Sequence, residues 1–252
     1  DKKLEALGIR CCIFNPLTPS LSIKGNTRDH RKIAIIDGTI AFTGGINLAD
    51  EYINAYRKYG HWKDTAVMFK GPAVNNFTVA FLAIWDYLRS EDEDYMLFLQ
   101  PGLSERDALA DQGFIQPFVD SPLDNESVGE TIYFNLINKA QRYVYIMTPY
   151  LIISNEMVMA LCASAKSGVD VKIITPHIAD KWFVHEVTQS YYRTLTECGV
   201  KIYEYTPGFM HAKTFLVDDN MVSLEPSTWI IGVCIFILNV VSGCIRRLLW
   251  QP

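Results

Sequence analysis

Hydrophobic and polar positions along this chain follow two different periods, and the change of period marks the expected elements. Residues 73–88 carry apolar side chains at helical spacing after Pro72, a residue that favours the first turn of a helix. Residues 143–148 and 200–205 are instead short β-favouring runs bounded by turn residues. The pattern therefore predicts helices and strands that follow one another along the chain.

The second half of the chain shows this alternation most regularly. We expect helices over residues 126–142, 155–166 and 181–198, and strands over residues 143–148, 169–175 and 200–205. Such an order is typical of an α/β fold, with helices layered on a sheet whose strands pair largely in parallel.

The first half begins with residues 1–8, which we interpret as the last turns of a helix that ends at Gly8, followed by a strand over residues 9–14. Asp37-Gly38 is a hairpin turn signal between strands expected over residues 30–36 and 39–43. A further strand is expected over residues 65–69.

Two segments of the chain share one polar skeleton. Residues 29–38 read DHRKIAIIDG and residues 211–218 read HAKTFLVD, so both contain the pattern H-x-K-x-x-x-x-D. In each, the His and the Lys are two positions apart, so we expect them to project from the same face of one strand. One copy is a weak signal, but by composition two copies arise by chance in about one chain in ten thousand.

The duplicated pair predicts chemistry on a phosphodiester. Imidazole acts as a nucleophile or a proton donor near neutral pH, and ammonium binds phosphate. If the two copies face each other, one histidine attacks phosphorus, the other protonates the leaving oxygen, and two lysines hold the remaining oxygens. This scheme uses no metal ion and no other cofactor.

The two motifs, with Gly44-Gly45-Ile46-Asn47 after the first, resemble the phospholipase D superfamily. Longer runs are similar to bacterial cardiolipin synthases: DHRKIAIIDGTIAFTGGINLADEY from Asp29, GHWKDT from Gly60, TPYLII from Thr148, GVDVKIITPH from Gly168 and YEYTPGFMHAK from Tyr203. The similarity runs from the first residue to about Asn220.

The resemblance implies a phospholipase D-like α/β fold of two pseudo-symmetric lobes, each with a mixed β-sheet flanked by helices. We expect a partial first lobe over residues 1–90, a linker over 91–113, a second lobe over 114–220 and an atypical hydrophobic tail over 221–252. Because cardiolipin synthases carry membrane helices and more of the first lobe before this region, the resemblance also predicts a chain truncated at its amino end and divergent at its carboxyl end.

The tail contains an almost uncharged run, residues 229–245, followed by Arg246-Arg247. As a helix its 17 residues would extend about 25 Å, at the short limit for a bilayer core. A short membrane helix, an interfacial anchor and a buried helix are the alternatives, and we expect membrane association. No residue here matches the second Asn of the superfamily, although Ser223 and Ser227 are nearby.

The resemblance implies that two phosphatidylglycerols give cardiolipin and glycerol through a phosphatidyl-histidine. It assigns His30 as the nucleophile and His211 as the general acid, with the reverse assignment open. Lys32 and Lys213 hold the phosphoryl group, and Asn47 donates its amide to a phosphoryl oxygen.

The aspartates of the motifs, Asp37 and Asp218, are expected to orient the motif groups without contacting the substrate. The other histidines, His61, His177 and His185, are expected to be structural or to lie at the rim of the site.

Net charge and cysteine spacing limit the kinds of binding partner that we expect. The net charge is −5, so no overall basic field favours nucleic acid, and the six cysteines show no metal-binding spacing. The resemblance implies that the partners are phosphatidylglycerol, anionic membrane lipids and the membrane itself, at the cytoplasmic side of a bacterial cell membrane. A divalent metal at the acidic run 91–94 is less expected than a solvated charge run.

Three other functions stay open. A sister enzyme, such as a phosphatidylserine synthase or a phospholipase D, would use the same catalytic residues with another acceptor. A nuclease would need a basic groove. An inactive, membrane-associated remnant is the non-enzymatic alternative.

Overall fold

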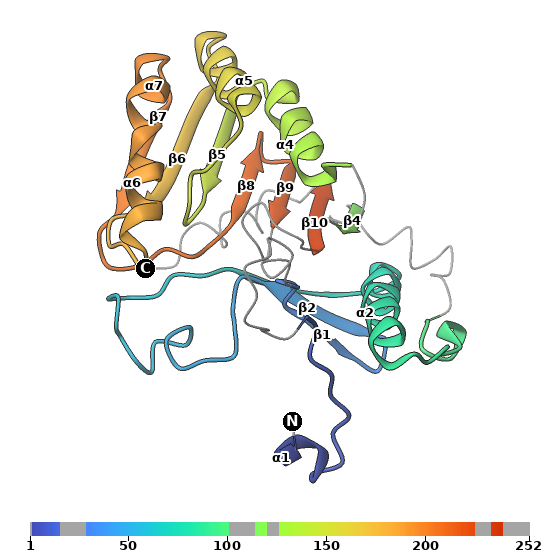
Figure 1. Cartoon of the computed structure of the whole chain (residues 1–252). Coiled ribbons are helices and arrows are strands. Elements are labelled where there is room, and N and C mark those ends of the chain that lie inside the picture. Colours follow the sequence, from blue (N-terminus) through green and yellow to red (C-terminus); the bar gives the residue numbers. More distant parts are fainter. Residues whose placement is uncertain (1, 16–28, 101–113, 120–125, 225–232, 239–252) are drawn as a thin grey trace.

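The structure is a computed structural model that describes residues 2–15, 29–100, 114–119, 126–224 and 233–238. Within these ranges the chain forms two sheets. One has three strands in the order β1-β2-β3, and the other has seven strands in the order β4-β10-β9-β8-β5-β6-β7. In Figure 1 the smaller sheet lies below the larger one, and helices accompany both.

The smaller sheet is an antiparallel meander. Its strands are β1 (Ile33–Ile36), β2 (Ile40–Gly44) and β3 (Ala66–Lys70), and β3 leads into α2 (Ala73–Arg89). Asp37 and Gly38 take positive φ angles of 50° and 62°, so the predicted hairpin turn is confirmed. Phe77 of α2 is fully buried against Phe69 of β3, with ring centroids 4.8 Å apart. The predicted helix therefore covers the small sheet through Val74 and Phe77, whereas Phe81 of the same apolar stripe is 48% exposed.

The amino-terminal segment differs in part from the prediction. A short α1 (Lys2–Glu5) ends as expected, with Gly8 at a φ of 77°. The strand expected over residues 9–14 is absent from the described structure, because this segment pairs with no neighbouring strand.

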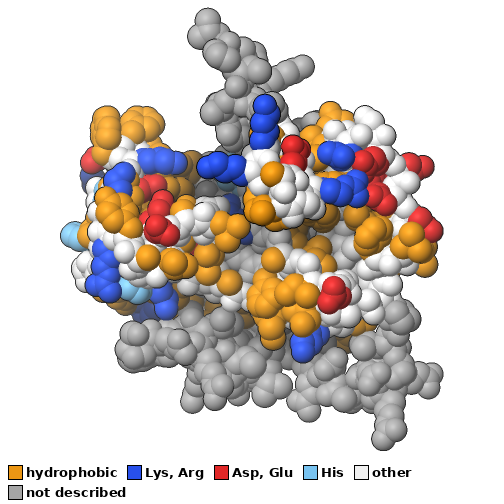
Figure 2. All heavy atoms as spheres, turned by 90° about the horizontal axis from the view of Figure 1, so that it is seen from below, with side chains coloured by type: hydrophobic (Ala, Val, Ile, Leu, Met, Phe, Trp, Pro, Cys, Tyr) orange, Lys and Arg blue, Asp and Glu red, His pale blue; other side chains and the backbone are white. Residues whose placement is uncertain are grey.

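The acidic run after α2 forms ion pairs. Glu91 accepts from both Arg10 and Arg89 in front of η2 (Tyr95–Leu97). Figure 2 shows acidic and basic side chains interleaved on the side of the molecule where α2 lies. Among the described residues, no group of three or more His, Cys, Asp or Glu side chains is arranged to hold a metal ion.

The larger sheet contains most of the second half of the chain. Its elements are, in sequence order, β4 (Phe114–Val119), α4 (Val128–Lys139), β5 (Tyr143–Met147), α5 (Asn155–Lys166), β6 (Asp170–Pro176), α6 (Trp182–Ser190), α7 (Tyr192–Glu197), β7 (Lys201–Tyr205), β8 (Thr214–Val217), β9 (Met221–Leu224) and β10 (Val233–Leu238). Only β5-β6 and β6-β7 pair in parallel, and the other neighbours are antiparallel. The sheet is therefore mixed, and the expectation of largely parallel pairing is wrong for its other half.

The faces of this sheet have different partners. Helices α4, α5 and α7 pack on one face, around a core that includes Leu161, Ile173 and Leu195. The helix expected over residues 181–198 is two helices, because the chain breaks at Tyr191. On the opposite face, Leu216 lies in a small buried cluster with Val67 of β3. The two sheets therefore pack against each other through apolar side chains.

The expected tail is part of the larger sheet. Strand β9 pairs with β8, and β10 lies between β9 and β4, so the sheet continues beyond residue 220. A helix over residues 229–245 is wrong for residues 233–238, which are β10; the other residues of that run lie outside the described ranges. A run that is apolar at every position suits a strand with sheet neighbours on both sides as well as a helix. None of the helices in the described ranges is long and apolar enough to span a bilayer.

Candidate active site

Both motifs lie just ahead of a strand. His30 and Lys32 precede β1, and His211 and Lys213 precede β8, so the prediction that these pairs lie within strands is wrong by a few residues. In each copy the lysine Nζ donates to the carbonyl oxygen of its own histidine, at 2.7 Å in the first motif and 2.9 Å in the second. The repeat in the sequence is thus a repeat of local geometry.

The second motif is attached directly to the first lobe. The segment before Asp64 runs beside the segment before Lys213, and the Lys63 carbonyl accepts from the His211 backbone N–H at 2.7 Å. The two backbones approach most closely at Gly208, where a Cβ atom would lie 2.3 Å from the backbone nitrogen of His61. Only glycine permits this approach, so these two segments place the second motif against the first lobe.

Asp64 is the partner of the second histidine. Its Oδ2 lies 2.8 Å from Nδ1 of His211 and accepts from Trp62 Nε1 at 3.3 Å, while Oδ1 accepts from the Thr65 backbone N–H. The Asp64 side chain is only 3% exposed. Gly45 makes room for it, because a Cβ atom there would lie 2.1 Å from Asp64 Oδ1. Gly45 therefore admits a carboxylate of the protein itself.

Burial and charge set the protonation of this cluster. Burial lowers the pKa of His211, although the hydrogen bond to Asp64 opposes this effect. Burial also acts to raise the pKa of Asp64, but the hydrogen bond and charge of His211, with the charge of Lys213, outweigh it and hold that pKa below its usual value. The carboxylate is therefore ionised and the imidazole is neutral over a wider pH range than in water.

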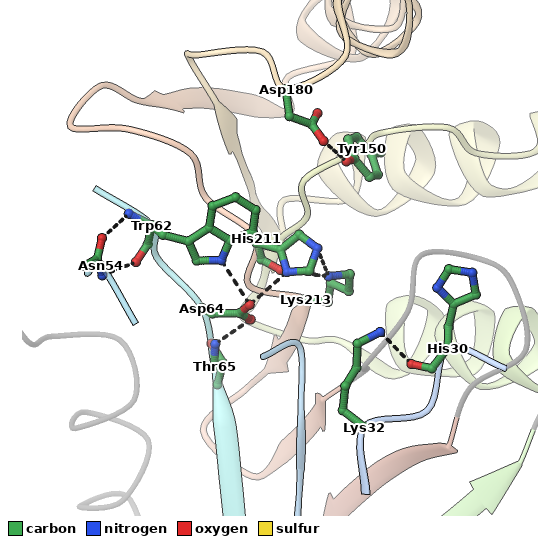
Figure 3. Close-up of polar contacts among 10 residues, drawn as sticks. All are labelled: His30, Lys32, Asn54, Trp62, Asp64, Thr65, Tyr150, Asp180, His211 and Lys213. Atoms are coloured by element: carbon green, nitrogen blue, oxygen red, sulfur yellow. Dashed lines mark hydrogen bonds and ion pairs between the residues drawn. The ribbon is translucent and has the colours of Figure 1, made fainter. Parts of the chain in front are cut away.

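Lys213 is the most buried cation of the site. Its residue is 6% exposed, its Nζ lies 3.2 Å from Nε2 of His211, and burial lowers its pKa to about 7. Lys32 of the first motif is close enough for its charge to contribute to the lowered pKa values of both His211 and Lys213. Figure 3 shows His30 and Lys32 on one side of Lys213 and His211 on the other. The two motifs therefore converge on one place, as predicted.

Asn47 is linked to this centre through one intervening residue, Tyr52. Its side chain hydrogen-bonds to Tyr52, whose ring meets the His211 ring edge-on at a centroid distance of 5.7 Å. Phe209 packs 6.0 Å from the same imidazole. Phe209 and the adjacent Met210 are each 1% exposed, so they belong to the core and to the wall that holds the imidazole.

The two motif aspartates do not contact the histidines. Asp218 accepts from the backbone N–H groups of residues 141–143 at 2.7, 2.8 and 2.9 Å, which fixes the turn before β5. Asp37 is exposed, and its carbonyl oxygen accepts from Gln100 Nε2 at 3.2 Å. Their expected supporting role is therefore at most indirect, and for Asp218 it is exerted on the backbone.

Asp64 is the functional residue that the sequence analysis missed. It stands 147 positions from His211, and no spacing within either motif points to it. The available signal was the GHWKDT run, in which an acidic residue follows a tryptophan just before a strand. The three other histidines all have polar partners: His61 lies 2.8 Å from the Tyr205 hydroxyl, His177 lies 2.6 Å from Glu204, and His185 Nε2 lies 3.0 Å from Gln189 Nε2.

Comparison with known proteins agrees with this geometry. Residues 133–232 match the family model described as cardiolipin synthase, PLD-like domain. A cardiolipin synthase from Geobacillus sp. is 38% identical over 224 residues, covering 88% of this chain and 44% of that protein. The chain belongs to the phospholipase D superfamily. The family match continues past residue 220, where the sequence alone had suggested that the similarity stops.

Other members of the superfamily give the same result. A cardiolipin synthase from Alkalihalophilus pseudofirmus is 35% identical and covers 90% of this phospholipase D-like chain. The crystal structure of phosphatidylserine synthase from Haemophilus influenzae shares the fold, with a TM-score of 0.61 at 14% identity, over 87% of this chain and 60% of that one. The chain spans about half the length of the curated relatives it matches.

Proposed function

We propose that this chain transfers phosphatidyl groups in the manner of a cardiolipin synthase, converting two phosphatidylglycerols into cardiolipin and glycerol. One observation carries the proposal: Asp64 of the first lobe is bonded to His211 of the second, with Lys213 and Lys32 beside them. The relatives named cardiolipin synthase support the choice of lipid substrate and of a bacterial setting.

The geometry favours His211 as the nucleophile, which reverses the assignment expected from the sequence. Its Nδ1 faces Asp64, so an Nδ1–H donated to the carboxylate leaves Nε2 with the lone pair that attacks phosphorus. The lowered pKa of His211 keeps this ring neutral near pH 7. His30, approaching from the other motif, then serves as the acid.

The reaction takes place in two displacements. Nε2 of His211 forms a bond to the phosphorus of the first phosphatidylglycerol, the bond from phosphorus to the head-group oxygen breaks, and His30 gives its proton to that oxygen, so glycerol leaves. A hydroxyl of the second phosphatidylglycerol then returns a proton to His30 and attacks phosphorus. The P–N bond breaks, cardiolipin is released and both histidines are restored.

The lysines stabilise the charge that grows on the phosphoryl oxygens. Lys213, with a pKa of about 7, gains its proton more readily when an anionic phosphate enters. Lys32 provides the second cation, and Asn47 is placed near the same centre through Tyr52. We propose that the reaction, with lipids as both donor and acceptor, takes place at the cytoplasmic side of the bacterial membrane.

A donor with an activated leaving group tests the proposal. Phosphatidyl-p-nitrophenol needs little acid assistance, so the His30→Ala chain should release about one equivalent of p-nitrophenol and gain the mass of one phosphatidyl group on His211. The His211→Ala chain should do neither. An adduct on His30 instead would reverse the assignment.

The unmodified chain separates the alternatives. With labelled phosphatidylglycerol alone we expect labelled cardiolipin and glycerol. Phosphatidic acid as the sole product would make the chain a phospholipase D, transfer to added serine would make it a phosphatidylserine synthase, and no product at all would show the inactive remnant.

A further inference from the structure

A second polar pair borders the site beyond the two motifs. Tyr150 follows β5, Asp180 follows β6, and the Tyr150 hydroxyl donates to Asp180 Oδ2 at 2.5 Å. Because β5 and β6 are parallel neighbours, their carboxyl ends open at the same edge of the sheet, where ligands of α/β folds bind. Figure 3 shows the pair on the side of His211 and Lys213 that lies away from Asp64.

Several contacts place this pair next to the phosphate-binding groups. Burial is the main cause of the lowered Lys213 pKa, and the charge of Asp180 acts on the same ammonium in the opposite direction. The Tyr150 ring lies 6.3 Å from Phe209, which in turn packs on His211. Tyr150 and Lys213 also line one small cavity of about 40 Å³, whose other walls include the core residues Met157 and Leu161.

Asp180 retains unused hydrogen-bonding capacity. Its Oδ1 is buried and has no hydrogen-bond partner in the part of the chain that the structure describes. It does not cap α6, whose N-cap is Lys181. The residue as a whole is only half-buried, so rotation of the carboxylate brings this oxygen to a ligand without moving the backbone.

A carboxylate whose charge acts on the phosphate-binding Lys213 needs a purpose other than phosphate binding. It repels the phosphoryl group, and an ionised carboxylate accepts hydrogen bonds but donates none. The ligand group that complements it is a hydroxyl. A head-group glycerol carries two free hydroxyls within a few bonds of the phosphorus that the lysines hold.

We infer that Asp180, held in place by Tyr150, accepts a hydrogen bond from a head-group hydroxyl and so selects phosphatidylglycerol over lipids that lack one. This inference rests on the proposed function, and it assigns head-group recognition to a residue outside both motifs. It is a binding contact, so it is measurable without turnover.

Binding of two short-chain lipids tests it. Dihexanoyl-phosphatidylglycerol and dihexanoyl-phosphatidylethanol carry the same charge and differ in the head-group hydroxyls, and both are used as monomers by calorimetry with the His211→Asn chain to prevent reaction. We expect about tenfold tighter binding of the glycerol lipid, as for one hydrogen bond to a charged group. Adding Asp180→Asn should remove that preference and leave binding of the ethanol lipid unchanged or tighter.

Matched variants make the outcome decisive. Asp170→Asn is the same change at the opposite end of β6, where Asp170 pairs with Lys172 and Lys201, and it should keep the preference. Tyr150→Phe removes the hydroxyl that holds Asp180 and should reduce the preference even if Asp180→Asn does not fold. A preference that survives both changes, or equal binding of the two lipids by the parent, overturns the inference but not the proposed function. Failure of the parent to bind either lipid removes both.

Discussion

The first and second motifs share one local hydrogen-bonding arrangement but lie in different surroundings. In both, the lysine returns to the carbonyl oxygen of its histidine, and the aspartate starts a left-handed turn with a φ near 50°. The His211 ring has a buried carboxylate partner, Asp64, which comes from the other lobe.

The aspartates show the same difference in surroundings. Asp218 accepts from three backbone N–H groups and Asp219, just after the motif, is engaged with Tyr143 and Arg142, whereas Asp37 is exposed. The comparison teaches that one sequence signature can be set in different surroundings, which residues outside the motif determine.

Removing the carboxylate tests this difference most severely. Asp64→Asn should lower phosphatidyl transfer about 10⁴-fold, the order found when a carboxylate that orients a catalytic imidazole is neutralised. Product formation from labelled phosphatidylglycerol gives the rate, and Asp50→Asn, an exposed change in the nearby loop, is the control. A loss of less than about fivefold would mean that Asp64 does not support the reacting histidine.

Gly45→Ala should have the next largest effect, about 10²-fold, because its Cβ would occupy the space of Asp64 Oδ1. The effect should act through the carboxylate. In an Asp64→Asn chain the same glycine change should therefore cost little more, and a double-mutant cycle of initial rates measures this. Fully additive losses would show that Gly45 acts on something other than Asp64.

Lys213→Arg should change the pH profile. With the p-nitrophenyl donor, which needs no proton from His30, activity should rise as His211 loses its proton below its usual pKa, and fall as Lys213 loses its proton at about 7. Guanidinium stays charged, so the arginine chain should lose the falling limb and be about tenfold slower at its optimum. An unchanged falling limb would assign it to another group.

Substituting the two motif aspartates should have different effects on the free energy of unfolding, and the difference should not appear in the reaction rate. Burial acts to raise the pKa of Asp218, but its backbone hydrogen bonds outweigh this and lower it, so its contribution is present above the usual aspartate pKa and lost as pH falls through the lowered value. Asp218→Asn should cost about 1–2 kcal/mol near pH 7 and less below pH 4 by urea unfolding. Asp37→Asn should stay within about 0.5 kcal/mol, and equal losses would contradict the comparison.

Local patterns predicted the parts of this molecule that local forces determine. The helix after Pro72 and the turn at Asp37-Gly38 depend on neighbouring residues, and both appear where expected. The convergence of His211 with Lys32 was also predicted, because a repeated motif with one chemistry implies a shared substrate.

The sequence analysis missed the features that depend on residues far away in the sequence. The run around Ile235 is apolar on both faces, and only its pairing with β4 and β9 makes it a strand and not a helix. Residues 9–14 favour β structure but meet no partner strand in the described structure. The role of Asp64 depends on its contact with His211, 147 positions away in the other lobe. The residues around Asp64 in the sequence therefore did not reveal that role.

The backbone pairing near Gly208 has a consequence for the order in which the site is assembled during synthesis. Here the lobe synthesised first holds the carboxylate and the lobe synthesised last holds the imidazole, and one run of main-chain hydrogen bonds joins them. A nascent chain therefore lacks a complete centre until the second half has folded onto the first.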